Sequence, residues 1–550
     1  MKQSIKLFSL CLVVLLSVFA TSTVLAQKKT KIRLERADLL KNLKLENLNI
    51  IRYLGNVHFF YDSTSVRCDS AYYNDEANQF DAYGNVVVQK GSSKIFGDKL
   101  HYDGKTSTGK LTGQEVKLID EETMLITKEV NFNSKTNFVY YPVPGVITTK
   151  DSKLTSKKGY FDKNISLLAF SGDVVMDNPD GVIKTDSLTY NTKSEVASFF
   201  KNTRITNDDG FIYCNKGWHN RQLKQSSFQQ DAYLINGAQR LFANNIFYDE
   251  PKGYARATDN VVVVDTTNNT YLFGQKANYW KNEEAAEVTD NPFFVAIDNK
   301  DTLFLRSDFM YLQSIKPKDT TKTDSTQHLI KAIGNVRFYR TDIQGLCDSL
   351  IYQTKDSTLY MYATPILWND VNQITADLIK VLSANKKIHE MEFIGNAFIT
   401  SHEDSIFYNQ IRGKTIDAHF IDGKLNTMDI LGNGQAIYYI RDNNVLTMVN
   451  RSEGSKIKVN IKENKVSKIN VMQKPTSNLY PIDKVEYEDI TLKGFKWLDN
   501  KRPKNKYSIL ENSKLLFPKP KVLPPPKTKE PDAKPTQKEN NDKKLKIKSK

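Results

Sequence analysis

Four aspartates recur at similar places in the sequence and are the first candidates for chemistry: Asp69, Asp98, Asp186 and Asp348. Paired carboxylates would suit general acid–base cleavage of glycans, as in a right-handed β-helix with a lyase or hydrolase site. Each acid, however, occupies one position of a repeated pattern, as a turn or strand-start residue would. None of the seven histidines lies in a ligand-spaced pair such as HExxH. We therefore predict no catalytic residue, no cofactor and no enzymatic activity.

The cysteines do not predict a reactive or metal site either. Cys11 falls in the N-terminal apolar segment, which leaves Cys68, Cys214 and Cys347. An odd and sparse set argues against a disulfide framework, and the spacings fit no zinc site. Because all three occupy a similar place in the repeat, we predict that they are packing residues and that there is no metal site.

These aspartates and cysteines belong to a six-residue block that recurs along the chain. Examples are CDSAYY (68–73), GDKLHY (97–102), TDSLTY (185–190) and CDSLIY (347–352). The ends of successive blocks are 28 to 32 residues apart, with one longer spacing of 41. A fixed period of this size is typical of stacked repeats.

Each block alternates apolar and variable positions, which predicts a β-strand with one buried face. A second element begins with Gly-Asn, as in GNVHFF (55–60), GNVVVQ (84–89) and GNVRFY (334–339). Glycine and asparagine tolerate a positive φ, so we predict a turn at each Gly-Asn pair. Each repeat is therefore predicted as turn, strand, loop and strand.

The two ends of the chain differ from the repeats. Residues 1–26 combine a positive start, a short apolar run and small residues before Ala26, which predicts a cleaved secretory signal peptide. Residues 502–550 are rich in proline and lysine and cannot bury a core. Much of the net charge of +15 lies there, because residues 514–550 alone contribute +8.

The segment GNVVVQKGSSKIFGDKLHYD (84–103) resembles the OstA/LptA-like family of lipopolysaccharide-transport proteins. The same arrangement returns as GNVRFYRTDIQGLCDSLIY (334–352), and QITADLIKV (373–381) matches its Ala-Asp variant. The resemblance covers roughly residues 50–400. It implies an all-β fold, an elongated β-jelly-roll of two facing, twisted antiparallel sheets that open like a folded taco. It also implies an apolar groove between the sheets that carries the acyl chains of lipopolysaccharide across the periplasm.

We divide the chain according to these signals. The expected regions are a signal peptide (1–26), OstA-like β-jelly-roll repeats (27–315), a polar loop or linker (316–327), continued OstA-like repeats (328–400), a less regular β region (401–501) and a basic, disordered tail rich in proline and lysine (502–550).

The inward positions of the predicted strands are the candidates for the lipid groove. Burial of an acyl chain is favourable by about 0.8 kcal/mol per methylene group, although the same side chains could form an ordinary packed core. The candidates are Val57, Phe59, Val86, Val88, Leu100, Tyr102, Leu188, Tyr190, Val336, Phe338, Leu350 and Tyr352.

This interpretation predicts a periplasmic bridge protein of outer-membrane assembly. The expected partners are lipopolysaccharide or lipid A, and other lipopolysaccharide-transport proteins joined end to end by β-strand addition. The basic tail could contact an anionic membrane surface, and no nucleic acid is expected. The alternative is a non-catalytic structural or adhesive β-solenoid at the cell surface.

Overall fold

The computed structural model describes residues 31–509. The exceptions are residues 46–47, 180, 208–209, 299–300, 316–326, 386, 405, 444 and 464. The predicted signal peptide therefore lies outside the described residues, as do all of the predicted polar loop except Gln327 and the basic tail beyond residue 509. All described residues belong to the first of two units of the chain, residues 1–511.

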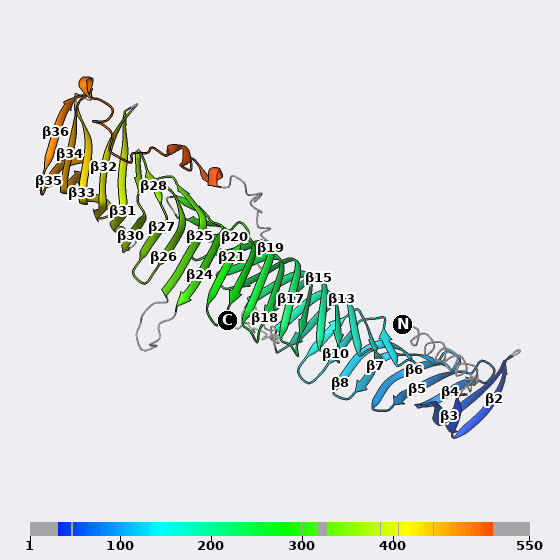
Figure 1. The fold of residues 1–550 in the computed structure, drawn as a ribbon. Coiled ribbons are helices and arrows are strands. Elements are labelled where there is room, and N and C mark those ends of the chain that lie inside the picture. Colours follow the sequence, from blue (N-terminus) through cyan, green and yellow to red (C-terminus); the bar gives the residue numbers. More distant parts are fainter. Residues whose placement is uncertain are drawn as a thin grey trace, which may run out of the picture. The chain divides into compact units, whose positions relative to one another are not determined.

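The described chain is almost entirely antiparallel β structure, which confirms the predicted all-β class (Figure 1). It contains thirty-six strands and three short 3-10 helices, and no α-helix occurs among the described residues. We group the strands into three stacks.

The N-terminal stack comprises β1 (Arg33–Arg36), β2 (Leu39–Leu45), β3 (Leu48–Tyr61), β4 (Thr64–Asn74), β5 (Gln79–Lys90), β6 (Ser93–Asp103), β7 (Thr108–Asp120) and β8 (Thr123–Asn133). The middle stack comprises β9 (Phe138–Tyr141), β10 (Gly145–Thr148), β11 (Lys153–Ser156), β12 (Lys158–Asp162), β13 (Leu167–Asn178), β14 (Gly181–Asn191), β15 (Val196–Asn207), β16 (Gly210–Asn220), β17 (Gln225–Asn236), β18 (Gln239–Asp249), β19 (Tyr254–Asp265) and β20 (Thr270–Trp280).

The C-terminal stack comprises β21 (Ala285–Thr289), β22 (Phe293–Ile297), β23 (Thr302–Arg306), β24 (Phe309–Ile315), β25 (Gln327–Arg340), β26 (Ile343–Gln353), β27 (Thr358–Tyr362), β28 (Ile366–Asn369), β29 (Asn372–Thr375), β30 (Leu378–Ala384), β31 (Lys387–Asp404), β32 (Phe407–Ile421), β33 (Lys424–Asp442), β34 (Val445–Lys462), β35 (Lys465–Met472) and β36 (Thr476–Pro481). The 3-10 helices are η1 (Ile482–Lys484), η2 (Asp499–Lys501) and η3 (Lys506–Ile509).

Successive strands pair as hairpins, so that each strand contacts its neighbours in the sequence. At several steps two short strands take the place of one long strand, as where β9 and β10 both pair with β8. The strands form one continuous hydrogen-bonded network. The two facing sheets that the sequence predicted are thus joined to each other through the long strands.

The two sheets are joined where each long strand bends. We call this bend the corner, and in strands such as β3 it lies at the Gly-Asn pair. In β3, Leu54 pairs with Ser70 and Val57 pairs with Cys68, so the intervening Gly55 and Asn56 form a one-residue bulge. Their φ angles are 74° and 47°. The predicted positive φ is confirmed, but the prediction of a turn is wrong. A bulge bends a strand and increases its twist without reversing the chain.

The aspartate of the repeated block accepts a hydrogen bond from the asparagine at this corner. Asn85 Nδ2 donates a hydrogen bond of 2.9 Å to Asp69 Oδ2, and a Cβ atom on Gly84 would lie 2.4 Å from the same oxygen. Glycine is therefore required here by space as well as by φ. Equivalent hydrogen bonds join Asn56 to Asp38, Asn335 to Asp308 and Asn396 to Asp377.

The four aspartates singled out in the sequence all lie inside strands and not at turns or strand starts, so that part of the prediction is wrong. Asp69, Asp98, Asp186 and Asp348 belong to β4, β6, β14 and β26, and all four are exposed. The corner needs an outward acceptor on the neighbouring strand, which explains why the acid recurs without forming a catalytic pair.

The cysteines lie on the inner side of the corner, where only small side chains fit. Cys68, Cys214 and Cys347 are buried and free of disulfides, which confirms their predicted packing role. Burial raises the pKa of Cys68 to about 12, that of Cys214 to about 11 and that of Cys347 to about 12. Other repeats place Gly97, Thr127, Thr185 and Ala243 at this position.

The corners bend each stack into two walls. Wall A holds the strand segments that lie next to turns 62–63, 91–92 and 121–122 and the equivalent turns of later repeats. Wall B holds the segments that lie next to turns 75–78 and 104–107 and the equivalent turns of later repeats. The inner faces of the walls meet in the N-terminal stack: the ring centroids of Phe59 on wall A and Phe80 on wall B are 4.7 Å apart.

The end of the described chain, residues 482–509, forms a segment that we call the strap. The Gln373 side chain makes two hydrogen bonds to the backbone of the strap. Its Nε2 donates to Lys496 O and its Oε1 accepts from Leu498 N, both at 2.7 Å. Gln410 does the same with Ile490 and Leu492, at 2.9 Å. Buried glutamine amides therefore replace a partner strand for this segment.

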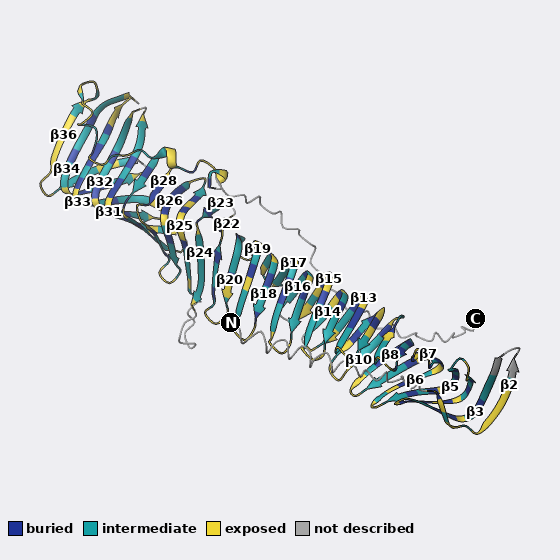
Figure 2. Cartoon of the chain, turned by 45° about the vertical axis from the view of Figure 1, so that its right-hand side comes forward, coloured by how far each residue is buried: buried dark blue, intermediate teal, exposed yellow. Residues whose placement is uncertain are grey.

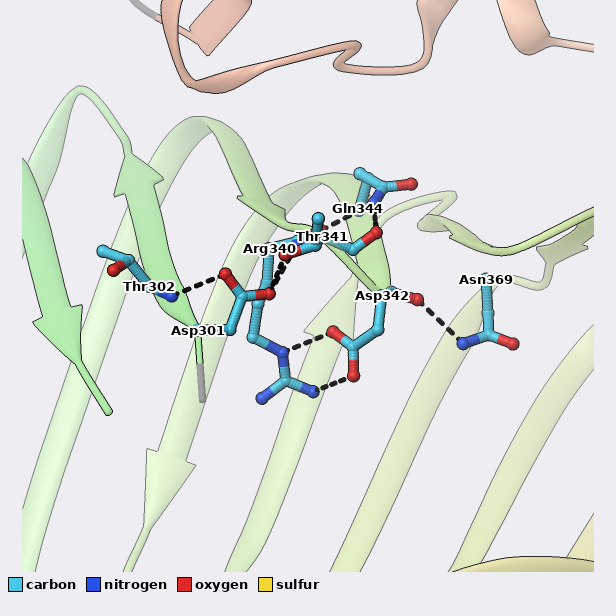
Figure 3. A network of polar contacts seen from close by, with 7 residues as sticks. All are labelled: Asp301, Thr302, Arg340, Thr341, Asp342, Gln344 and Asn369. Carbon is cyan, nitrogen blue, oxygen red and sulfur yellow. Dashed lines mark hydrogen bonds and ion pairs between the residues drawn. The ribbon is translucent and has the colours of Figure 1, made fainter. Parts of the chain in front are cut away.

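A third glutamine ties the strap to the ends of the strands. Gln344 Oε1 accepts from Arg502 Nε at 2.8 Å, while its Nε2 donates to Arg340 O. Figure 3 shows this part of the structure, where Arg340 also pairs with Asp342. The sequence predicted a less regular β region over residues 401–501; the structure instead has long strands as far as Pro481, followed by the strap.

Candidate functional site

The inner face of wall A carries one row of apolar side chains that passes from strand to strand. Each member of the row is the direct register partner of the next, so the row is continuous through the N-terminal and middle stacks. Its members are Phe59, Val66, Val88, Ile95, Leu118, Leu125, Ile147, Leu154, Met176, Ile183, Ile205, Ile212, Leu234, Leu241, Val263 and Leu272. We call it the apolar row.

Buried and partly buried segments are interspersed along the strands (Figure 2). Within the apolar row, burial changes along the chain. In the N-terminal stack Phe59 is 1% exposed, Val88 3% and Leu125 6%. In the middle stack the same row is only partly buried over seven successive strands. The members concerned are Met176, Ile183, Ile205, Ile212, Leu234, Leu241 and Val263.

The middle stack is nevertheless closed beneath this row. The inner residues next to the corners, which form the floor between the walls, are buried there as they are elsewhere. They include Leu188, Phe199, Cys214, Ile246 and Val261. A buried floor below a partly exposed aliphatic row makes this inner face the candidate apolar groove of the middle stack.

Wall B of the middle stack alternates large and small side chains. Its inner row runs through Tyr190, Ala197, His219, Ser226 and Tyr248 in register order. His219 Nδ1 and Ser226 Oγ are 3.0 Å apart. Burial raises the pKa of Tyr190, and the side chain of Arg221 opposes this shift. One side of the groove is therefore aliphatic and the other carries polar groups.

In the N-terminal stack, aromatic rings from wall B fill the same space. Phe80 and Tyr102 have ring centroids 5.4 Å apart, and Tyr102 and Phe132 follow at 6.2 Å. The Tyr102 hydroxyl is 2.7 Å from Ser134 Oγ, and burial raises the pKa of Tyr102.

The rims of the N-terminal stack also bond to each other across the opening. The Tyr61 hydroxyl on wall A donates to Gly104 O on wall B at 2.8 Å, and Lys90 Nζ donates to Asn137 Oδ1 at 2.8 Å. Backbone hydrogen bonds also run along the wall B rim in both stacks, such as Ser134 N to Ser107 O in the first and Arg221 N to Glu195 O in the second. The N-terminal stack is therefore closed by its side chains.

All twelve groove candidates from the sequence lie on inner faces, and most of them are core residues in this structure. Tyr190 and Tyr352 are partly exposed. The other ten are buried: Val57, Phe59, Val86, Val88, Leu100, Tyr102, Leu188, Val336, Phe338 and Leu350. A role of any of them in lipid contact stays a prediction.

The partly exposed members of the apolar row in the middle stack are not among the candidates predicted from the sequence. Ile183, Ile212 and Leu241 each lie two residues before a repeated block, at 185, 214 and 243. An aliphatic residue at this offset was a usable signal. Its exposure was not, because that depends on the opposite wall.

The described residues contain no group of three or more histidine, cysteine, aspartate and glutamate side chains that could hold a metal ion. Within the same residues, no helix is long and apolar enough to span a membrane.

Comparison with known families gives one match. The model of the OstA-like protein family matches residues 29–179 and again residues 158–244. This part of the chain is OstA-like. The match includes the N-terminal stack and the middle stack as far as β18, and so contains the partly exposed apolar row from Met176 to Leu241. The predicted family resemblance is confirmed for these residues. A search of curated proteins found no match.

Proposed function

We propose that this protein binds lipopolysaccharide in the middle stack, with the acyl chains lying against the partly exposed apolar row. The observation that carries this proposal is the change in burial of one continuous row, which is buried in the N-terminal stack except at Leu118 and is partly exposed over the seven strands from Met176 to Val263. The OstA-like match over residues 29–244 supports the same function. The protein then acts by binding and transport, not by catalysis.

The dimensions and energies fit an acyl ligand. Six strand spacings of about 4.8 Å give a groove about 29 Å long, which exceeds the roughly 15 Å of hydrocarbon in one leaflet of a bilayer. Each buried methylene group contributes about 0.8 kcal/mol. Several chains side by side could therefore offset the roughly 4–15 kcal/mol that association costs.

The ends of the strand ladder support a bridge between other transport proteins. Within the described residues, β2 pairs with β3 alone and β36 pairs with β34 alone. Such edges leave backbone groups available to a strand of another chain. We place the protein in the periplasm as a part of outer-membrane assembly, with its basic tail at an anionic membrane surface.

The test is native mass spectrometry with lipid extraction on protein purified from its own envelope. Ile205→Asp combined with Ile212→Asp places two charges in the groove, and we expect at least a tenfold loss of bound lipopolysaccharide. Thr206→Asp is the matched control, because Thr206 is exposed and follows Ile205 in β15. A folded protein that is free of lipid and does not bind added lipopolysaccharide would overturn the proposal.

An adhesive role at the cell surface is the second candidate, and one feature of the outer face favours it. The ring of Tyr233 lies 5.6 Å from that of Phe211, 5.1 Å from Tyr213 and 5.7 Å from Phe242. Rows of rings can stack on sugars. Glycan binding that is lost in Tyr233→Ala, in a protein that carries no lipid, would favour this candidate over transport.

A further inference from the structure

In the middle stack, the rim of wall B carries a net positive charge. On wall B, the turns 163–166, 192–195, 221–224 and 250–253 contain five basic and two acidic residues, a formal charge of +3. We call these turns the basic rim.

In the N-terminal stack, the rim of wall B carries no net charge. Its turns 75–78, 104–107 and 134–137 contain two basic and two acidic residues, so their formal charge is zero. A net positive rim on wall B therefore accompanies the half-open groove and not the sealed stack.

The basic rim continues the polar side of the groove. Arg221 follows the inner residue His219 by two positions, and Lys224 precedes the inner residue Ser226 by two. Lys193 follows Tyr190 by three positions, and all three cations are exposed. Cations thus border the wall that carries hydroxyl and imidazole groups, opposite the aliphatic wall.

Neighbouring carboxylates reduce the charge of this rim only in part. Lys224 Nζ lies 3.5 Å from Glu250 Oε1, with both side chains more than half exposed. Exposed pairs of this kind contribute little and exchange partners easily. A phosphate with a charge near −2 would be a stronger partner for the same ammonium group.

We propose that the basic rim binds the phosphate groups of a lipid whose acyl chains lie on the apolar row. This inference rests on the proposed function and adds an orientation to it. The acyl chains face wall A, and the sugar and phosphate groups face wall B. Lys193, Arg221 and Lys224 are the residues that we expect to make the contact.

The test compares two probes, bisphosphorylated lipid A and the same lipid with both phosphates removed, on the full-length mature protein. We expect the unmodified protein to bind the phosphorylated probe at least about tenfold more tightly at low salt, and this preference should shrink as salt screens the rim. The triple variant Lys193→Gln, Arg221→Gln, Lys224→Gln should lose most of the preference and still bind the dephosphorylated probe. The control is Lys105→Gln with Lys135→Gln, at the corresponding turns of the sealed stack, which should keep it.

The outcomes separate the two proposals. If the unmodified protein binds both probes equally, or if the triple variant keeps the preference, the inference about the basic rim is overturned and lipid binding stands. If the control variant loses the preference as fully as the triple variant, the effect belongs to general charge, and the inference is also overturned. If neither probe binds, the proposed function falls, and the inference falls with it.

Discussion

The N-terminal and middle stacks are built from the same repeat, yet one is a filled core and the other a groove. Both have corners at the repeat's positive-φ pair and an apolar row on wall A. They differ in what wall B presents at one position of the repeat, which is Phe80 in the first stack and Ala197 or Ser226 in the second. At the next position both stacks have a large side chain, such as Tyr102 and Tyr190. Exposure of the row is therefore set by the side chains that face it, and not by the row itself.

The largest effect that we expect comes from removing an aromatic ring from the core of the N-terminal stack. Phe80→Ala removes a ring that packs against both Phe59 and Tyr102, and it should cost about 3–5 kcal/mol of stability in this stack. Hydrogen exchange of β4 to β6 would report the loss locally. Phe200→Ala, which removes an exposed ring on β15, is the control and should change exchange little. A cost below about 1 kcal/mol for Phe80→Ala would show that the stack is not held by its rings.

A somewhat smaller effect should distinguish the corners of the two stacks. The Cβ of an alanine at Gly84 would lie 2.4 Å from Asp69 Oδ2, which Asn85 holds in place, whereas that of an alanine at Gly172 would lie 2.9 Å from Lys157 Cβ and Cδ. Both glycines have positive φ, 76° and 79°. We expect Gly84→Ala to cost about 2–3 kcal/mol and Gly172→Ala about 1 kcal/mol less. Urea unfolding measures both, and equal costs would contradict the role of the aspartate.

Converting the middle stack into a sealed one should affect binding more than folding. Ala197→Phe with Ser226→Phe places rings at two wall B positions that now carry small side chains, and we expect lipid binding to fall about tenfold, or about 1.4 kcal/mol. Ser198→Phe, one residue away on the outer face of β15, is the matched control. Unchanged binding in the double variant, with the protein folded, would mean that lipid does not use this space.

The smallest difference that we expect between the two stacks is in the reactivity of their buried cysteine thiols. Because burial raises the pKa of Cys214 to about 11 and that of Cys68 to about 12, both are neutral thiols at pH 8. Alkylation should therefore rise about tenfold per pH unit up to about pH 11 at Cys214 and about pH 12 at Cys68. Rates measured by mass spectrometry at several pH values would show this. Fast labelling of either cysteine at pH 8 would contradict its burial.

Much of the architecture could be predicted from particular residues. The spacing of blocks such as GDKLHY (97–102) predicted antiparallel repeats, and alternation placed Val88, Leu100 and the other candidates on inner faces. The Gly-Asn pairs predicted positive φ correctly but not the corner, because the local conformation of a turn and of a bulge is similar. Only the pairing of Leu54 with Ser70 and Val57 with Cys68 distinguishes the two.

The strap could not be predicted for a related reason. The strap is held by hydrogen bonds from Leu498 N to Gln373 and from Leu492 N to Gln410, and these partners are 125 and 82 residues apart in the sequence. Glutamines in alternating strands look like surface residues when only the sequence is known. Their burial follows from a segment whose position no local pattern specifies.

The sequence by itself determined the class of fold, the repeat, the inner faces and the OstA-like character of residues 29–244. These follow from periodicity and from local backbone preferences, which act over a few residues. The tertiary structure alone decided which part of the apolar row is core and which part is groove. That choice depends on whether the facing wall supplies large or small side chains, and facing residues such as Phe59 and Phe80 become neighbours only after each strand has bent at its corner.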